Sequence, residues 1–272
     1  MRFHLLFLFT VCTSSLVCSQ TSSFRVLAFF TAKNDQAHIS FVKEAHVWFQ
    51  AQGKLNGFQY DSTSEWSKMN KKELSKYKIL IFLDTRPEES EHRKAFQHYM
   101  ENGGGFLGFH FSGFALNNSA FPQNWDWYHN EFLGSGEYGS NTWRPTSATL
   151  KLENPNHPIA IGLPPVISSA PNEWYRWTND LSANKSINIL LSIDSSSFPL
   201  GTGPKLHEIW HNGYYPVVWT NTHYRMVYFN MGHNDIDYEN GTNKELSRTF
   251  GNAHQDQLIL NALKWVARSR EK

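Results

Sequence analysis

The sequence predicts an α/β domain with an open, mostly parallel twisted sheet and helices on both faces. Short apolar runs, which are typical of buried parallel strands, alternate with longer segments whose apolar residues recur at helical spacing. Glycine follows the first two helical segments, at Gly53 and at 103–105, and we expect each helix to end there. This alternation favours parallel strands joined by right-handed crossovers.

The first half of the chain contains the clearest elements. Apolar runs predict strands over residues 25–30, 58–60, 78–83 and 106–109. The helix after the first strand has apolar residues at i, i+4, i+7 and i+8, namely Phe41, Ala45, Trp48 and Phe49. A second helix is expected over 89–102, with the apolar residues Ala95, Phe96 and Tyr99.

The second half is less regular. Residues 116–145 are rich in aromatic residues, asparagine and glycine, which indicates an insertion or a set of binding loops. Strands are then expected over 147–152, 187–193, 206–210, 216–219 and 226–231. A closing helix carries on one face the residues Ile259, Ala262, Leu263 and Val266. Because no segment has the composition of an interdomain linker, we expect one domain over residues 24–268.

The composition excludes several classes of protein. The 272 residues include 25 Lys and Arg against 24 Asp and Glu, so the net charge of +1 provides no broad basic surface for nucleic acid. Hydrophobic residues make up 40% and charged residues 18%, as in a packed globule. No apolar run reaches the roughly 18 residues of a membrane span.

The first 19 residues predict a secretory signal peptide. Arg2 precedes an apolar stretch over residues 5–9, and small polar residues lead to Ser19. Cleavage after Ser19 would export the protein, to the periplasm or the cell exterior. Alternatively, Cys18 could be the lipid-anchored first residue of a lipoprotein, although Val17 is bulkier than such a cleavage site favours.

Cys12 and Cys18 are the only cysteines, and both lie in this segment. The rest of the chain therefore has no thiol. This excludes disulfide scaffolds, thiolate zinc sites and cysteine nucleophiles.

Three histidines lie at or near the ends of predicted strands. His38 follows the first strand, His110 the fourth and His233 the last. In an open α/β sheet, ligands bind beyond the carboxyl ends of the strands, so these side chains can converge on one cleft.

The sequence around His110 predicts a tight turn from strand to helix. Gly108 precedes it, and Ser112 and Gly113 follow it, which suits a strained elbow that presents its central side chain. Hydrolases of that design carry serine or cysteine at the centre. A histidine there is suited to acid/base catalysis or metal ligation; alternatively, it is a buried residue hydrogen-bonded to backbone.

Several segments resemble the ThuA-like (trehalose-utilisation) family. The sequence Gly-Gly-Gly-Phe-Leu-Gly-Phe-His at 103–110 is similar to its glycine-rich strand and elbow, and residues 125–134 are similar to its aromatic segment. The remaining similar blocks follow in the family's order at 154–159, 172–175 and 226–233. The likeness extends over about 24–266. Two departures are His223-Tyr224-Arg225, in place of a glycine-rich turn, and the unmatched segment 208–211.

The resemblance implies a fold of the flavodoxin-like type found in class I glutamine amidotransferases. In those enzymes a cysteine occupies the elbow and a histidine follows a late strand. By position His110 replaces the cysteine, and His233 matches the late histidine, so glutamine hydrolysis through a thioester is not available. The association with trehalose and keto-sugars implies a small carbohydrate ligand.

Three interpretations of the polar residues remain open. His38, His110 and His233, with Glu173 as a carboxylate partner, have the ligand types of a zinc or similar divalent site. Alternatively, His110 acts with His233 or Glu173 as a metal-free acid/base pair. In the third interpretation these groups only hold the walls of a binding cleft, and the protein binds sugar without turnover.

Aromatic residues make up 15% of the chain, and four of them lie in or near the irregular segment: Trp125, Trp127, Tyr128 and Trp143. Such rings can stack on sugars and form substrate-binding subsites. Equally, they can form local hydrophobic cores. The sequence therefore predicts an exported carbohydrate-related protein that cleaves or isomerises a glycoside or keto-sugar, or else a sugar-binding protein without catalysis.

Overall fold

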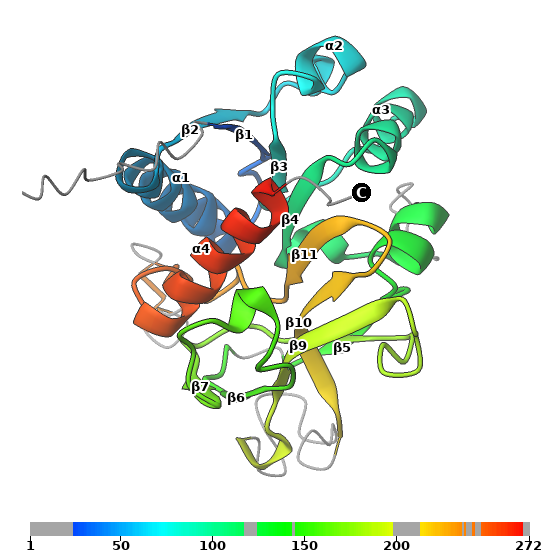
Figure 1. The fold of residues 1–272 in the computed structure, drawn as a ribbon. Helices are drawn as coiled ribbons and strands as arrows, with labels where there is room; N and C mark the ends of the chain where they lie inside the picture. Colours follow the sequence, from blue (N-terminus) through cyan, green and yellow to red (C-terminus); the bar gives the residue numbers. More distant parts are fainter. Residues whose placement is uncertain are drawn as a thin grey trace, which may run out of the picture.

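The computed structural model describes residues 24–116, 124–142, 145–197, 213–235, 237, 241–242 and 246–268. Its main feature is a nine-stranded sheet with the order β2-β1-β3-β4-β11-β10-β9-β6-β7 (Figure 1). The five strands from β2 to β11 pair in parallel, and the last four extend the sheet by antiparallel pairing. The parallel part has the 2-1-3-4-5 order of flavodoxin-like sheets.

The strands of the parallel part are β1 (Phe24–Phe29), β2 (Phe58–Thr63), β3 (Ile79–Phe82), β4 (Gly105–Phe109) and β11 (Arg225–Phe229). The antiparallel part contains β10 (Tyr215–Asn221), β9 (Ile187–Ile193), β6 (Thr149–Leu152) and β7 (Val166–Ser168). A separate two-stranded sheet pairs β5 (Tyr138–Asn141) with β8 (Tyr175–Trp177).

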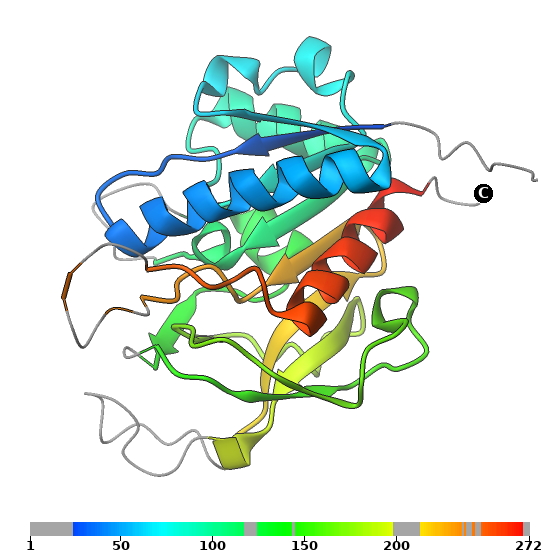
Figure 2. The same cartoon turned by 90° about the vertical axis from the view of Figure 1, so that its left-hand side faces the viewer.

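Helices cover both faces of the sheet, as the sequence predicts. Figure 2 shows α1 (Gln36–Asn56) and α4 (Ala253–Ala267) on one face, where their apolar residues join one hydrophobic core. The other face carries α2 (Lys71–Leu74), α3 (Ser90–Glu101) and a π-helical turn, Trp127–Phe132, which share a second core. No helix among the described residues is both long and apolar enough to cross a bilayer.

The first helix does not end at Gly53, and that prediction is wrong. The helix continues to Asn56 and ends at Gly57, whose φ of 74° fits a left-handed cap. Gly53 is buried inside α1. A Cβ at this position would lie only 2.6 Å from the Phe58 carbonyl oxygen, so a larger residue does not fit there. Glycine at this position therefore permits close packing of α1 on β2, a requirement that local sequence does not distinguish from a helix stop.

The irregular part of the chain contains more structure than the sequence indicates. The segment expected to form loops holds the π-helical turn and β5, and the short strands β7 and β8 had no apolar run of their own. The strand expected over 206–210, like the predicted signal peptide, lies outside the described residues.

Candidate active site

His110 occupies the elbow after β4, where a short 3₁₀ turn, His110–Gly113, begins. Its φ of 34° is rare for a residue with a side chain, so the backbone is strained there. The hydroxyl of Tyr228, on the neighbouring strand β11, donates a 2.6 Å hydrogen bond to the His110 carbonyl oxygen and stabilises the turn. At Gly113 a Cβ would lie 2.7 Å from the Tyr228 ring, which explains the small residue after the elbow.

His38 is placed by the start of α1. Asp35 caps the helix, and its Oδ1 accepts hydrogen bonds from the backbone N–H groups of Ala37 (2.8 Å) and His38 (3.3 Å). Asp84, at the end of β3, accepts from the backbone N–H groups of Thr31 and Ala32 and so shapes the preceding loop. His38 thereby sits on the first turn of α1, facing the elbow.

His233 follows β11 and is held by Asn172. The Asn172 Oδ1 accepts from the backbone N–H groups of Gly232 (3.1 Å) and His233 (3.3 Å). Gly232 has a φ of 133°, and a Cβ there would lie 3.2 Å from that of His110. The late strand therefore passes close to the elbow and delivers the third imidazole beside it.

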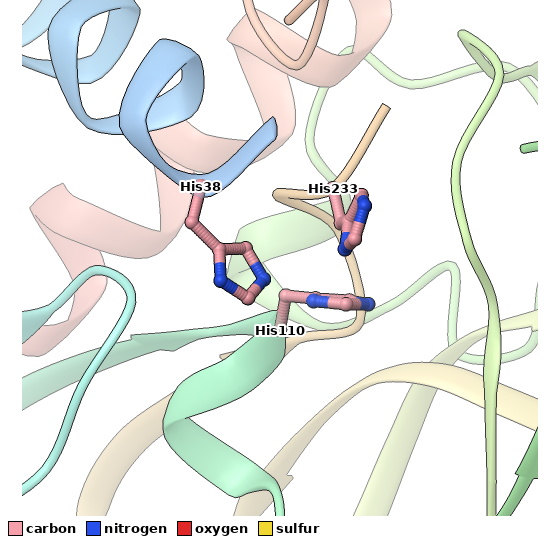
Figure 3. Close-up of side chains that lie close together, drawn as sticks. All are labelled: His38, His110 and His233. Atoms are coloured by element: carbon pink, nitrogen blue, oxygen red, sulfur yellow. The ribbon is translucent and has the colours of Figure 1, made fainter. Parts of the chain in front are cut away.

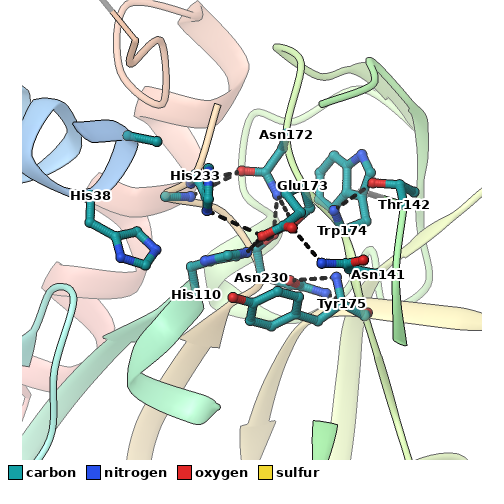
Figure 4. A network of polar contacts seen from close by, with 12 residues as sticks. His38, His110, Asn141, Thr142, Asn172, Glu173, Trp174, Tyr175, Asn230 and His233 are labelled. Atoms are coloured by element: carbon teal, nitrogen blue, oxygen red, sulfur yellow. Dashed lines mark hydrogen bonds and ion pairs between the residues drawn. The ribbon is translucent and has the colours of Figure 1, made fainter. Parts of the chain in front are cut away.

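Glu173 connects the two segments through both its backbone and its side chain. Its N–H donates to the His233 carbonyl at 2.8 Å, and its carbonyl accepts from His110 Nε2 at 2.8 Å. Its carboxylate Oε2 lies 3.1 Å from His233 Nδ1 and 3.8 Å from His110 Nε2, and Asn141 donates to Oε1. Figure 4 shows this network from His110 through Glu173 to Asn141.

The hydrogen bonds fix which nitrogens are available to a ligand. Because a carbonyl only accepts, His110 Nε2 must carry its proton towards Glu173, which leaves Nδ1 as a bare lone pair. His110 Nδ1 and His38 Nε2 are buried and have no hydrogen-bond partner among the described residues. His233 Nδ1 has only its poorly aligned contact with Glu173.

The three imidazoles converge. One ring nitrogen from each of His38, His110 and His233 lies within 4.8 Å of the other two, and Figure 3 shows the rings grouped about a common centre. Tetrahedral zinc holds nitrogen ligands at about 2.1 Å, which places them about 3.4 Å apart. Small rotations of the rings would therefore bring the three nitrogens to ligand distance. We call these three residues the histidine cluster.

Burial and mutual repulsion keep two of the three imidazoles neutral. Burial lowers the pKa of His38 to about 4, aided by the charge of His233 and opposed by Asp35. Burial, with His233 and His38, holds the pKa of His110 well below its usual value. Burial also opposes charge on His233, but the neighbouring Glu173 carboxylate, with Asp35 and Asp235, outweighs it and raises that pKa. Neutral His38 and His110 are the forms that ligate metals.

The structure does not bring the predicted aromatic residues to the histidine cluster as exposed rings. Tyr128 is fully buried and Trp125 is 8% exposed; both belong to the core under the π-helical turn. Trp127 is half-buried, packs on Phe132 with ring centroids 5.0 Å apart, and donates to the Tyr224 hydroxyl. Trp143 lies outside the described residues. Their role in substrate binding stays a prediction.

Three residues of the site were missed as site residues in the sequence: Asn141, Asn172 and Tyr175. Asn172 and Tyr175 flank Glu173 in a block that resembles the ThuA-like family, so that block carried a signal for them. The Tyr175 ring lies against His110, with centroids 3.9 Å apart. Asn141, on β5, carried no signal, because its contact with Glu173 depends on the pairing of β5 with β8.

Comparison with known proteins identifies the family. The family model described as "Trehalose utilisation", ThuA, matches residues 25–266. The chain belongs to the ThuA family. A ThuA-like protein from Bacteroides uniformis is 34% identical, with a TM-score of 0.75, over 89% of this chain and 91% of that one.

A ThuA-like protein from Parabacteroides merdae has the same fold at 18% identity, with a TM-score of 0.63 over 92% of each chain. No curated protein matches this chain. Membership of the ThuA family indicates a carbohydrate-related role, and it confirms the family and the α/β fold expected from the sequence.

Proposed function

We propose that this ThuA-family protein is an exported enzyme that acts on a keto-sugar at a divalent metal held by the histidine cluster. The observation that carries the proposal is the convergence of three ring nitrogens within 4.8 Å, in a cluster where His38 Nε2 and His110 Nδ1 are buried with no hydrogen-bond partner among the described residues. Buried polar atoms are normally satisfied, so such a group of imidazoles is suited to a bound cation.

Glu173 is placed to act as the base. Its carboxylate lies 3.1 Å from His233, and its second oxygen is held by Asn141. In the proposed reaction Glu173 accepts a proton from the carbon next to the sugar's keto group, and the electrons of the C–H bond shift towards the keto oxygen. If that proton returns to the former keto carbon, and the hydroxyl on the deprotonated carbon passes its proton to the former keto oxygen, the sugar is isomerised. If instead a glycosidic oxygen on the next carbon leaves and takes the proton from Glu173, a C=C bond forms next to the keto group and the sugar is cleaved with release of an alcohol.

A bound divalent cation would polarise the keto oxygen and stabilise the negative charge that develops on it. The protein's part is to fix the ligands. Asn172 holds the backbone of His233, and the Glu173 carbonyl holds the ring of His110, as outer residues do in metal sites.

The arrangement of carboxylates favours a keto-sugar over a simple glycoside. Hydrolysis of glycosides commonly uses two free carboxyl groups, about 5–9.5 Å apart. Here Asp35, whose charge also acts on His38 and His233, accepts two backbone N–H groups as the cap of α1. The Glu173 carboxylate contacts the imidazoles of His110 and His233 directly, as suits a single proton transfer next to a carbonyl.

The test is to load the purified protein with Zn²⁺ or Mn²⁺ and to measure bound metal and turnover of a panel of 3-keto-glycosides and glycosides. We expect one metal ion per chain, and turnover of a keto-sugar that is lost on chelation. The variant His233→Asn should lose both. His46→Gln is the matched control, because His46 lies on α1 away from the cluster and bonds to Tyr60.

The competing function is sugar binding without catalysis. It is supported by the Glu173 network, whose hydrogen bond to His110 and contact with His233 give these groups a structural role in the walls of the site. Sugar binding in calorimetry, with no turnover and no metal across the whole panel, would establish that function instead. Turnover that survives removal of all metal would point to the metal-free acid/base pair.

The export part of the proposal rests on the predicted signal peptide. N-terminal sequencing of the protein recovered from its natural host should begin at Gln20, and the protein should be found outside the cytoplasm. A lipid-modified Cys18 would place it at a membrane surface, and an intact Met1 would remove the argument for export.

A further inference from the structure

Tyr175 is the aromatic residue packed directly against the elbow histidine. It is 4% exposed, and its ring is tilted by 34° to the His110 ring at a centroid separation of 3.9 Å. In Figure 4 the phenol runs alongside His110, with its hydroxyl end on the His38 side. The phenol ring therefore lies directly against the His110 imidazole.

The backbone of Tyr175 is held on both sides by Asn230. Asn230 bonds to it twice, accepting from the Tyr175 N–H at 3.2 Å and donating to its carbonyl at 2.8 Å. The Tyr138 ring meets the Tyr175 ring edge-on at 5.1 Å. Position and orientation of the phenol are thus set before any ligand arrives, which is the condition for a useful contact with substrate.

The hydroxyl of Tyr175 has no hydrogen bond to any residue in the described part of the chain, and, unlike the hydroxyl of Tyr128, it is not one of the buried atoms without a partner, so it is open to solvent or to a ligand. Its neighbour Tyr228 bonds to the His110 carbonyl at 2.6 Å, and Tyr99 to the Gly105 carbonyl at 3.3 Å. Tyr175 is held in place beside the histidine cluster, and its hydroxyl donates to no described residue. Such a hydroxyl is suited to donate a hydrogen bond to an oxygen of a bound ligand.

Glu173 and Tyr175 are two residues apart, with Trp174 between them packed elsewhere and donating to the Thr146 carbonyl at 2.7 Å. Alternate residues of an extended segment point to the same side. The carboxylate and the phenol are therefore presented to the same space, one as a proton acceptor and the other as a hydrogen-bond donor.

We propose that Tyr175 contacts the substrate, and that its hydroxyl donates a hydrogen bond to an oxygen of the sugar bound at the histidine cluster. This inference rests on the proposed function and adds a residue that selects and orients the sugar. The bond orients the oxygen next to the carbon from which Glu173 accepts its proton. Tyr175 is then a substrate-binding residue on β8, remote in sequence from all three histidines.

The experiment compares Tyr175→Phe with Tyr175→Leu in the metal-loaded protein. Phenylalanine keeps the ring against His110 and removes only the hydroxyl, whereas leucine also removes the ring contact. With a methyl 3-keto-glucoside as the probe, Tyr175→Phe should lower kcat/KM about 10-fold or more, mostly through KM, as expected for one lost bond to substrate. Its zinc affinity and Tm should match those of the wild type. Tyr99→Phe, which removes a hydroxyl bonded to the Gly105 carbonyl at the opposite end of β4 from His110, is the control and should keep kcat/KM.

Three other results would each contradict the assignment of Tyr175 as a substrate-binding residue. If Tyr175→Phe keeps kcat/KM within twofold while Tyr175→Leu loses it, the ring only positions His110, and the proposal is wrong. If Tyr175→Phe loses zinc, the residue acts through the histidine cluster and not on the sugar. If the wild type binds neither zinc nor the probe, the proposed function itself has failed, and the assignment of Tyr175 fails with it.

Discussion

The histidine cluster and the aromatic segment, residues 125–134, are both rich in side chains that suggest function, but the two regions use them in opposite ways. In the aromatic segment the rings of Trp125, Tyr128 and Phe132 pack on one another and on Phe96. Their apolar surface is therefore buried in the hydrophobic core. In the histidine cluster, one ring nitrogen of His38 and one of His110 are buried and have no hydrogen-bond partner in the part of the chain that the structure describes.

This difference separates packing from function. Apolar rings gain free energy wherever they exclude water, so burial alone explains the aromatic segment. A buried nitrogen without a partner costs free energy, as does the positive φ of His110. Features that cost stability and yet gather at one point indicate a functional site. Four measurements test whether the two regions differ in this way.

The largest expected effect is that of His110→Ala on turnover and bound metal. We expect the turnover of a keto-sugar to fall by about 10³-fold or more and the metal content to drop. Unfolding free energy should change by less than about 1 kcal/mol, because the Glu173 carbonyl keeps a second donor, Asn172 Nδ2 at 2.9 Å. Urea unfolding and metal analysis check this. A loss of about 1–3 kcal/mol with activity intact would make His110 a core residue.

Tyr128→Ala should show the opposite pattern. Its ring is fully buried among Phe82, Phe96 and Phe106, so its removal should cost about 3–5 kcal/mol of unfolding free energy. Trp127 is only half-buried, so Trp127→Ala should lower the unfolding free energy by less than Tyr128→Ala does. Sugar affinity of the folded protein should stay unchanged in both variants. A tenfold loss of sugar affinity in Trp127→Ala without loss of stability would instead show that the aromatic segment forms part of the sugar-binding site.

Acid should destabilise the protein partly through the aromatic segment. Burial, aided by the charges of Arg86 and Arg93, lowers the pKa of His129 to about 3. Unfolding restores a pKa of about 6.5, so between those values the unfolded chain binds the extra proton and stability falls as pH falls. We expect wild type to lose about 1–2 kcal/mol more than His129→Gln between pH 7.5 and 5. Urea midpoints at both pH values measure this. Equal losses would show that His129 is charged in the folded protein.

The smallest expected effect is that of Asn141→Ala. Asn141 donates a hydrogen bond to the second oxygen of the Glu173 carboxylate. Its removal should lower kcat/KM about tenfold by loosening the base, while zinc affinity and the spectrum of a cobalt-substituted protein stay unchanged. A loss of metal in this variant would mean that Glu173 ligates rather than accepts protons.

Much of this fold could be predicted from local patterns in the sequence. The strand at 187–193 was predicted with its observed bounds, and the buried strands before it were placed within a few residues. These elements are specified by apolar runs and helical spacing, which act over a few residues. Gly53 shows the limit, because its reason for being glycine is the carbonyl of Phe58 on another element.

The candidate site divides in the same way. The positions of His38, His110 and His233 after strands could be predicted, because parallel strands present their carboxyl ends at one edge. The tautomer of His110 could not, since it depends on the carbonyl of Glu173, 63 residues away. Asn141 and Tyr175 reach the site only because β5 pairs with β8 beside the main sheet.

The sequence by itself determined the α/β class, the family and the three imidazoles at strand ends, because each is encoded in short motifs or in their order. The tertiary structure was needed to show which ring nitrogens have no hydrogen-bond partner among the described residues, which carboxylate contacts the imidazoles and which aromatic rings are buried. Those properties arise from contacts between segments far apart in the chain, and burial changes the chemistry of a side chain through its surroundings rather than through its neighbours in sequence.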